Sequence, residues 1–349
     1  MMTESAGSEI RTEPCPKCDL CGCEGTFMYS NQRDRLFGAS GSWNLKRCLN
    51  KECGLIWLDP MPLEEDIGKA YASYYTHAAN NSGRVGLLKR IYQLIKRGYL
   101  AGRFNYHGDS AGFAVRSLGK LLYLFPLRRG EVEASVRYLH QVAQGRLLDV
   151  GCGSGEWLLS MRELGWRVEG LDFDENAVRV ARQMGMDVTL GALEDQHYPD
   201  DSFDAVTLNH VIEHVPDPNQ TMRECARILK KGGRLALGTP NSSSLSHQLF
   251  KQNWRGLEPP RHLHLFSMLS MRHSLELAGL RVVSIHPHIT KSVICESVLL
   301  WRGRTGPFTA SDRSWPLRVF ALFFNFVEWC LLKWNPSVAD CMVAVAVKQ

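Results

Sequence analysis

The feature that most constrains the fold is a regular alternation of short apolar runs with helical segments, which starts near residue 131. The apolar pattern predicts strands at 146–150, 167–171, 187–190, 203–208, 234–238 and 281–286, with a last one at 342–347. Helices are predicted before the first strand at 132–142 and between later strands at 157–164, 175–184, 219–229 and 268–278. Strands that alternate with helices form a mostly parallel sheet covered on both faces. The sequence therefore predicts an α/β fold with a doubly wound, seven-stranded sheet.

The chain has 349 residues, which leaves room for other segments on either side of this core. We expect a cysteine-containing module at 1–60, a basic helical linker or lid at 61–130, the α/β core at 131–290, an apolar helical insertion at 291–340 and the last strand at 341–349. Residues 1–13 are polar and acidic, without the apolar stretch of a signal peptide, so we expect a cytoplasmic protein with reduced thiols.

Six of the eleven cysteines lie between Cys15 and Cys53. Four of them form two close pairs, each followed by a glycine: Cys18 with Cys21, and Cys48 with Cys53. Two such pairs supply the four thiolates of a tetrahedral zinc site, which leaves no open coordination position and is structural. Cys15 and Cys23 leave the choice of ligands open, and free thiols in an irregular segment are the alternative.

A glycine-rich turn follows the first predicted core strand. Gly151, Gly153 and Gly155 allow a ligand to approach the backbone closely, next to the free N–H groups at the start of a helix. Their spacing differs from the Gly-x-Gly-x-x-Gly of dinucleotide enzymes and suits an amino-acid moiety and a ribose. Asp149 ends the strand before the turn, and Asp172 ends the next strand, where its carboxylate can accept hydrogen bonds from two ribose hydroxyls.

Six sequence blocks, in this order, resemble the class I S-adenosylmethionine-dependent methyltransferases. They are LDVGCGSG at 148–155, GLDFD at 170–174, SFDAV at 202–206, EHVPDP at 213–218, RILKKGG at 227–233 and TPN at 239–241. The resemblance covers about 146–286 and implies a Rossmann-like fold that binds S-adenosylmethionine. The block CGLIWLDP at 53–60 also resembles the second knuckle of a zinc-ribbon-like module that precedes this domain in many bacterial small-molecule and glycan methyltransferases.

The resemblance also implies roles for particular residues. The three glycines would pack on the methionine part of the cofactor, Asp172 would bind its ribose, and Asn209 and His210 would flank the sulfonium. The family often has an acidic residue directly after the glycine that ends the third strand, but Ala192 follows Gly191 here. Adenine binding is therefore assigned to the backbone of Ala192 and Leu193, or to Glu194.

Methyl transfer to a hydroxyl needs an aligned nucleophile and a base for its proton, and histidine is the usual base near neutral pH. Four histidines are candidates because they follow the fourth and fifth predicted strands: His210, His214, His262 and His264. Glu213 and His214 could instead be a capping or packing pair, and 261–264 a structural loop. If the 254–266 loop instead belongs to the active site, Trp254 would supply a wall of the site and Arg261 a cation for an acidic group of the substrate.

Two further segments are amphipathic. Residues 84–129 carry ten Lys or Arg against one Asp among large apolar residues, and residues 316–334 are mostly apolar with three charges. Three charges disfavour a membrane span, so we expect an interfacial helix or a lid. Together the two segments could contact an anionic membrane peripherally, on its inner face, although packing against each other is the alternative.

The function expected from the sequence is methylation, most simply of a hydroxyl on a small molecule, a sugar or a lipid-linked glycan. The alternatives are an RNA base methyltransferase and a non-catalytic module that only binds the cofactor. Nucleic acid is disfavoured as a partner because the basic residues are interleaved with aliphatic side chains instead of stacking aromatics. The Asn-Pro-Pro-Tyr-like loop of base amino methylation is also replaced by NHVI at 209–212.

Overall fold

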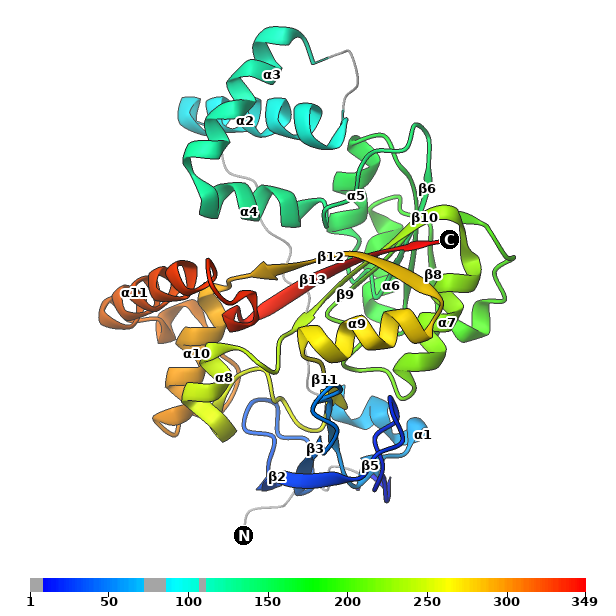
Figure 1. The fold of residues 1–349 in the computed structure, drawn as a ribbon, viewed down its shortest axis with the longest axis vertical. Coiled ribbons are helices and arrows are strands. Elements are labelled where there is room, and N and C mark those ends of the chain that lie inside the picture. The colour runs from blue at the N-terminus through cyan, green and yellow to red at the C-terminus, as the bar shows by residue number, and fades with distance from the viewer. Residues whose placement is uncertain (1–8, 72–85, 107–110) are drawn as a thin grey trace.

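The structure is a computed structural model, and it describes residues 9–71, 86–106 and 111–349. Its centre is a seven-stranded sheet with the order β12-β13-β10-β9-β6-β7-β8 (Figure 1). The strands are β6 (Arg146–Val150), β7 (Arg167–Asp172), β8 (Val188–Leu190), β9 (Phe203–Asn209), β10 (Leu229–Pro240), β12 (Leu280–His288) and β13 (Cys341–Lys348). Strand β13 is antiparallel to both of its neighbours, while β10, β9, β6, β7 and β8 are parallel. The predicted seven-stranded α/β sheet is confirmed.

Helices cover both faces of this sheet because successive strand residues point to opposite sides. Leu147 packs in one buried cluster with side chains of α5 (Glu156–Glu163) and α6 (Glu175–Gln183). Leu148 packs in another with side chains of α7 (Pro218–Ile228) and α9 (Met268–Leu277). The two clusters form the hydrophobic core on the two faces of the sheet.

One predicted helix differs from the structure. The sequence pattern predicted a helix at 132–142, but α4 spans Pro126–Ser135, and Arg137 and Tyr138 adopt positive φ angles of 49° and 55°. The physical reason lies in tertiary contacts, which the local pattern does not report. The Arg137 guanidinium lies 3.5 Å from the ring centre of Trp157 and forms an ion pair with Asp149, so the chain turns at that point.

The cysteine-containing segment forms three of the four strands of a second, smaller sheet with the order β11-β4-β3-β2. Its strands are β2 (Gly25–Gln32), β3 (Trp43–Cys48), β4 (Ile56–Leu58) and β11 (His264–Leu265). A short pair, β1 (Thr12–Glu13) and β5 (Met61–Pro62), lies beside it, followed by α1 (Glu64–Ile67) and η1 (Gly68–Tyr71). Because β11 belongs to the loop that follows β10, the core supplies one strand of this sheet.

The remaining helices lie outside the core (Figure 1). Before the core come α2 (Leu87–Phe104), α3 (Phe113–Gly119), η3 (Lys120–Leu124) and α4. After β8 and β10 come η4 (Glu194–Gln196), α8 (Leu245–Phe250) and η5 (Lys251–Asn253), and before β13 come α10 (Lys291–Trp301), η6 (Ala310–Asp312), α11 (Trp315–Leu331) and η7 (Pro336–Val338). Within the described ranges, no helix combines the length and the apolar character that a membrane crossing requires.

Candidate functional site

The glycine turn is built so that a ligand can contact its backbone. Gly151, Gly153 and Gly155 have φ angles of 72°, 55° and 79°, a region that glycine adopts without strain. A Cβ atom on Gly151 would lie 2.2 Å from a side-chain carbon of Val211, whereas a Cβ on Gly153 would have no atom within 4 Å. The turn is therefore packed underneath and open at Gly153.

The carboxylate of Asp172 connects this turn to the end of β7. Its Oδ2 accepts a hydrogen bond from the N–H of Gly153 at 2.7 Å, and its Oδ1 accepts one from the N–H of Asp174 at 2.9 Å. Each carboxylate oxygen has more than one lone pair, so Asp172 can also accept hydrogen bonds from vicinal hydroxyls of a ligand. An open glycine turn beside a fixed carboxylate fits the amino-acid and ribose parts of S-adenosylmethionine.

Asp149 lies below the turn and supports it. Its buried carboxylate forms an ion pair with Arg137 and accepts a hydrogen bond from the Thr207 hydroxyl at 2.7 Å. These contacts fix the end of β6, where the turn begins. Asp149 thus contacts Arg137 and Thr207 beneath the turn and supports the turn from there. The ion pair with Arg137 was not predicted from the sequence.

The residues assigned to adenine follow the third core strand. The N–H of Gly191 donates to the backbone carbonyl of Asp172 at 3.0 Å, which places this segment next to the ribose-binding candidate. Ala192 is exposed, whereas the Leu193 side chain is buried in the core. The Oε1 of Glu194 accepts a hydrogen bond from the Thr221 hydroxyl at 2.6 Å. Ala192 is thus exposed beside Asp172, whereas one oxygen of the alternative candidate, Glu194, is already hydrogen-bonded to Thr221.

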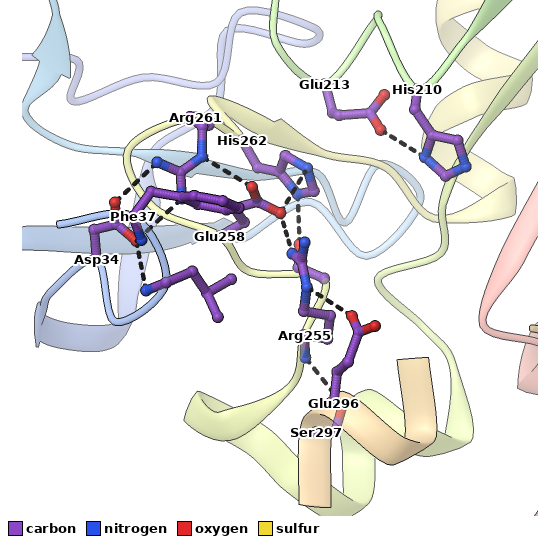
Figure 2. Close-up of polar contacts among 12 residues, drawn as sticks. Asp34, Phe37, His210, Glu213, Arg255, Glu258, Arg261, His262, Glu296 and Ser297 are labelled. Atoms are coloured by element: carbon purple, nitrogen blue, oxygen red, sulfur yellow. Dashed lines mark hydrogen bonds and ion pairs between the residues drawn. The ribbon is translucent and has the colours of Figure 1, made fainter. Parts of the chain in front are cut away.

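Asn209 ends strand β9, and His210 follows it directly. The N–H of His210 donates to the carbonyl of Gly238 at 2.8 Å, and a Cβ on Gly238 would lie 2.4 Å from Asn209 Oδ1. His210 Nδ1 lies 3.2 Å from Oε1 of the buried Glu213, and the His210 side chain is 48% exposed (Figure 2). With the Nδ1 proton directed to Glu213, the Nε2 atom of His210 is left as a proton acceptor.

Glu213 is ionised in this environment. Burial alone would raise its pKa, but the hydrogen bond and charge of His210 lower the pKa of Glu213 to about 2. The second oxygen, Oε2, accepts a hydrogen bond from the Thr239 hydroxyl at 3.0 Å. A fixed carboxylate that orients an exposed histidine is the arrangement that general-base catalysis uses.

The other predicted histidines are tied to neighbouring groups. The rings of His214 and His262 lie 4.7 Å apart, and Glu213, His214 and His262 place one ligand atom each within 4.8 Å of the others. His214 Nδ1 is 2.9 Å from the carbonyl of Arg261, and the Nδ1–H of the buried His262 donates to the carbonyl of Gly256 at 2.7 Å. Burial lowers the pKa of His262 to about 4, so this ring is neutral near pH 7.

His264 lies further from the turn. It belongs to β11, its side chain is fully buried, and its Nε2 atom is 3.1 Å from Asp19 Oδ2 in the cysteine-containing segment. Its surroundings are thus those of a packed strand in the small sheet.

Arg261 has a different role from the one expected. Its side chain is 0% exposed, and its guanidinium contacts Glu258 at 2.8 Å, Asp34 at 2.8 Å and 3.0 Å, and the ring of Phe37 at 4.5 Å (Figure 2). The interpretation of Arg261 as a cation for an acidic substrate group is therefore wrong, because two carboxylates already neutralise it. Asp34 lies 227 positions away in the sequence, so no local pattern could have indicated this contact.

The four predicted metal ligands meet in one cluster. The Sγ atoms of Cys18, Cys21, Cys48 and Cys53 all lie within 4.8 Å of one another. Cys18 and Cys53 are 3.7 Å apart and Cys21 and Cys48 are 3.4 Å apart, close to the edge of about 3.8 Å that four Zn–S bonds of about 2.3 Å would give. This donor set fits tetrahedral zinc, and Cys15 and Cys23 are not part of the cluster.

Comparisons with known proteins fall on the core. Residues 124–285 match the family described as "Methyltransferase domain". The chain is 40% identical over 133 residues to a ubiquinone biosynthesis O-methyltransferase of Xanthomonas oryzae pv. oryzae, a match that covers 36% of this chain and 54% of the relative. It is 40% identical over 109 residues to a demethylmenaquinone methyltransferase of Listeria welshimeri, covering 28% of this chain and 46% of the relative.

The chain thus spans about half the length of the curated relatives it matches. Among solved structures, an S-adenosylmethionine-dependent methyltransferase from Mesorhizobium loti aligns with a TM-score of 0.43 and 19% identity, covering 63% of this chain and 98% of that one.

Proposed function

We propose that this chain, which carries a methyltransferase domain at residues 124–285, transfers a methyl group from S-adenosylmethionine to a hydroxyl of a small molecule, a sugar or a lipid-linked glycan. The observation that carries the proposal is the open glycine turn at Gly153, held against the Asp172 carboxylate at 2.7 Å. The names of the relatives add support for an oxygen acceptor on a small molecule.

In this proposal, the glycine turn holds the amino-acid part of the cofactor, Asp172 holds the ribose hydroxyls, and the exposed backbone at Ala192 meets the base. Asn209, at the end of β9, lies beside His210 on the side where the methyl group would be. When bound, the cofactor supplies an electrophilic methyl group. The chain itself needs only to position the acceptor and remove its proton.

His210 is our candidate for the residue that removes the proton. Glu213 receives the Nδ1–H of His210, which fixes the tautomer and leaves Nε2 to accept the proton of the acceptor hydroxyl. The ionised Glu213 then stabilises the positive charge that His210 acquires. His262 and His264 are not given this role because both are buried and already hydrogen-bonded.

The choice of a lipid-linked acceptor rests on exposed apolar surface. On α11, large apolar side chains face solvent at Trp315, Val319, Phe320, Leu322, Phe323, Phe326 and Leu331. A second exposed set, which runs from the start of α3 to the first turn of α4, comprises Phe113, Leu121, Tyr123, Leu124, Phe125 and Leu127. Exposed apolar side chains near basic residues favour peripheral contact with an anionic membrane, where an amphipathic acceptor would be presented.

We also propose that the four-cysteine cluster binds one structural zinc ion. Four thiolates fill the tetrahedral coordination shell, so the metal would hold β2, β3 and β4 together without taking part in the transfer.

Binding of S-adenosylhomocysteine, measured by calorimetry, tests the proposed function. Asp172→Asn should weaken binding about 10- to 100-fold, because hydrogen bonds to a charged group contribute about 1.5–3 kcal/mol each. The matched control is Asp187→Asn, an exposed aspartate just before β8, which should bind normally. Absence of binding to the folded wild-type protein would refute the proposal.

A second measurement follows the transferred group. Radiolabelled cofactor, incubated with cell extract, should label a lipid, glycan or small-molecule fraction. Label in RNA would favour a nucleic-acid substrate, and cofactor binding with no labelled product in any fraction would favour a non-catalytic module.

A further inference from the structure

A pocket of about 460 Å³ lies between the cysteine-containing sheet and α8, outside the cofactor turn. Strands β2 and β3 supply one wall, and the segment after β10, together with α8 and the start of η5, supplies the other. The lining residues are Met28, Tyr29, Arg47, Ser242, Ser243, His247, Gln248 and Lys251.

The charge of this pocket has one sign. Arg47 and Lys251 line it from opposite walls, and none of its lining residues is an aspartate or a glutamate. Neither cation forms an ion pair with another described residue, in contrast to the adjacent Lys46, which lies 2.6 Å from Asp59. Two cations that face a concave space without a carboxylate attract an anion.

The wall contributes an unused polar group. Ser242 is only 3% exposed, and its Oγ has no hydrogen-bond partner in the described structure. A buried hydroxyl without a partner is costly, and an oxygen acceptor bound in the pocket would remove that cost. Together with the guanidinium of Arg47 and the ammonium group of Lys251, it gives the pocket three donor groups.

His247 also lines the pocket but adds no positive charge to it. The Nδ1–H of His247 donates to the carbonyl of Ser242 at 2.6 Å, so its Nε2 accepts the hydrogen bond from the Tyr29 hydroxyl at 3.0 Å. Burial lowers the pKa of His247 to about 4, so the ring is neutral near pH 7. The positive charge therefore comes from Arg47 and Lys251.

The pocket lies within reach of the proposed transfer site. Gly238 of β10 pairs with Asn209 of β9, and Ser242 follows Gly238 by four residues. Four residues extend at most about 15 Å at 3.8 Å each, and neighbouring strands are about 5 Å apart. An acceptor of about 20 Å or less could therefore occupy both places.

We propose that this pocket binds a phosphoryl group carried by the methyl acceptor, with Arg47 and Lys251 as its counter-ions and Ser242 as a hydrogen-bond donor. The inference rests on the proposed function, which it deepens by naming the substrate class: a phosphate monoester or diester, soluble or lipid-linked, with a hydroxyl at its other end. Phosphoryl oxygens suit the planar fork of arginine, and lysine acts as a point charge.

The test uses inorganic pyrophosphate as the probe and calorimetry on the full chain at low salt. The double variant R47Q/K251Q should bind pyrophosphate at least tenfold more weakly than the wild type, and S242A should lose about two- to tenfold. The matched control is K231Q/R281Q, which removes two exposed cations near the first residues of β10 and β12. These residues do not line the pocket, so pyrophosphate binding should be unchanged. All variants should bind S-adenosylhomocysteine like the wild type.

The outcomes separate the two proposals. Normal S-adenosylhomocysteine binding without pyrophosphate binding overturns the phosphoryl site alone, whereas loss of S-adenosylhomocysteine binding in the wild type overturns the proposed function. Equal weakening in both double variants shows unspecific charge attraction and overturns the site. Tighter binding of a single-stranded RNA, lost in R47Q/K251Q, reassigns the pocket to nucleic acid.

Vesicles that contain a polyprenyl phosphate distinguish the two sources of the group. If R47Q/K251Q loses vesicle binding, the site holds a lipid-linked phosphoryl group; if only pyrophosphate binding falls, it holds a soluble one. Either result supports the site.

Discussion

The loops that follow β9 and β10 use the same residue types for different purposes. Each places a buried glutamate close to a histidine at the same edge of the sheet: Glu213 with His210, and Glu258 with His262. Glu213 is paired with a half-exposed ring. Glu258 is paired with the guanidiniums of the partly buried Arg255 and the fully buried Arg261 (Figure 2).

The difference shows that the partner of a buried carboxylate decides its role. The Glu213–His210 pair keeps one ring nitrogen directed away from the protein, so a proton can leave or arrive. In the second loop, both cations are permanently charged, and Arg261 also joins Asp34 at 2.8 Å. The loop after β9 is thus suited to chemistry, whereas the loop after β10 connects the core to the cysteine-containing sheet.

The largest expected effect concerns the two histidines. His210→Asn should lower the turnover number about 10²- to 10⁴-fold, because it removes the proposed base, with little change in cofactor binding. His262→Asn, the matched change in the other loop, should lower stability but leave turnover of the folded protein within a few-fold of normal. Single-turnover methyl transfer and chemical unfolding measure the two quantities. Equal loss of turnover in both variants would remove the distinction between the loops.

The second prediction concerns Arg261. Arg261→Met should lower the free energy of unfolding by about 3–5 kcal/mol, because it leaves the buried Asp34 carboxylate without its cation and the buried Glu258 carboxylate with Arg255 alone. The control is Arg272→Met, where the exposed pair with Glu276 at 3.9 Å should matter by less than about 1 kcal/mol. Urea unfolding gives both values, and similar losses for the two variants would contradict the structural role of Arg261.

A third buried carboxylate can be compared with Glu213 and Glu258, because no cation is paired with it among the described residues. Glu328 on α11 is fully buried, and neither of its carboxylate oxygens has a hydrogen-bond partner among the described residues. Burial and the neighbouring Asp340 raise the pKa of Glu328 to about 9. The folded protein then keeps a proton that the unfolded chain loses above about pH 4.5, so this group makes stability fall as pH rises, up to about pH 9.

Glu328→Gln should therefore flatten the alkaline side of the stability profile. Between pH 7 and 9 the wild type should lose up to about 1.4 kcal/mol per pH unit relative to the variant. Glu163→Gln, on the exposed side of α5, serves as the control and should follow the wild type. Parallel profiles for wild type and Glu328→Gln would show that Glu328 is ionised in the folded state.

The smallest expected effect concerns metal removal. Chelation of the proposed zinc should raise amide hydrogen exchange at Leu58 and Leu265 by about tenfold, since the Leu58 N–H donates to the Leu263 carbonyl and Leu265 pairs with Ile56. Exchange at Thr207 and Leu208 in β9 should stay unchanged. Equal acceleration at the β4–β11 pair and in β9 would mean that metal removal destabilises the core as much as the small sheet.

Much of the core could be predicted from the sequence because its signals are local. The strands needed only their apolar runs, and the cofactor turn needed three glycines and one carboxylate within 25 positions, between Gly151 and Asp172. The cysteine pairs were also readable from their spacing. All three depend on contacts or periodicities between near neighbours.

The rest depended on contacts between distant residues. The sequence pattern predicted that the helix continues to residue 142, but α4 ends at Ser135. The chain turns there because the Arg137 guanidinium contacts Asp149 and Trp157. The sequence suggested that Arg261 could bind an acidic group of the substrate, but its guanidinium pairs with Asp34 in the structure. A charged residue's availability depends on what surrounds it in three dimensions, which a single sequence does not report.

The pairing of β11 with β4 also has a consequence for biosynthesis. The ribosome completes Ile56–Leu58 about two hundred residues before it makes His264–Leu265, so the nascent chain carries an uncovered apolar strand edge for most of its synthesis. Such an edge is a template for aggregation. A truncated chain that ends near residue 60 would keep it exposed, whereas the finished chain closes it with its own core.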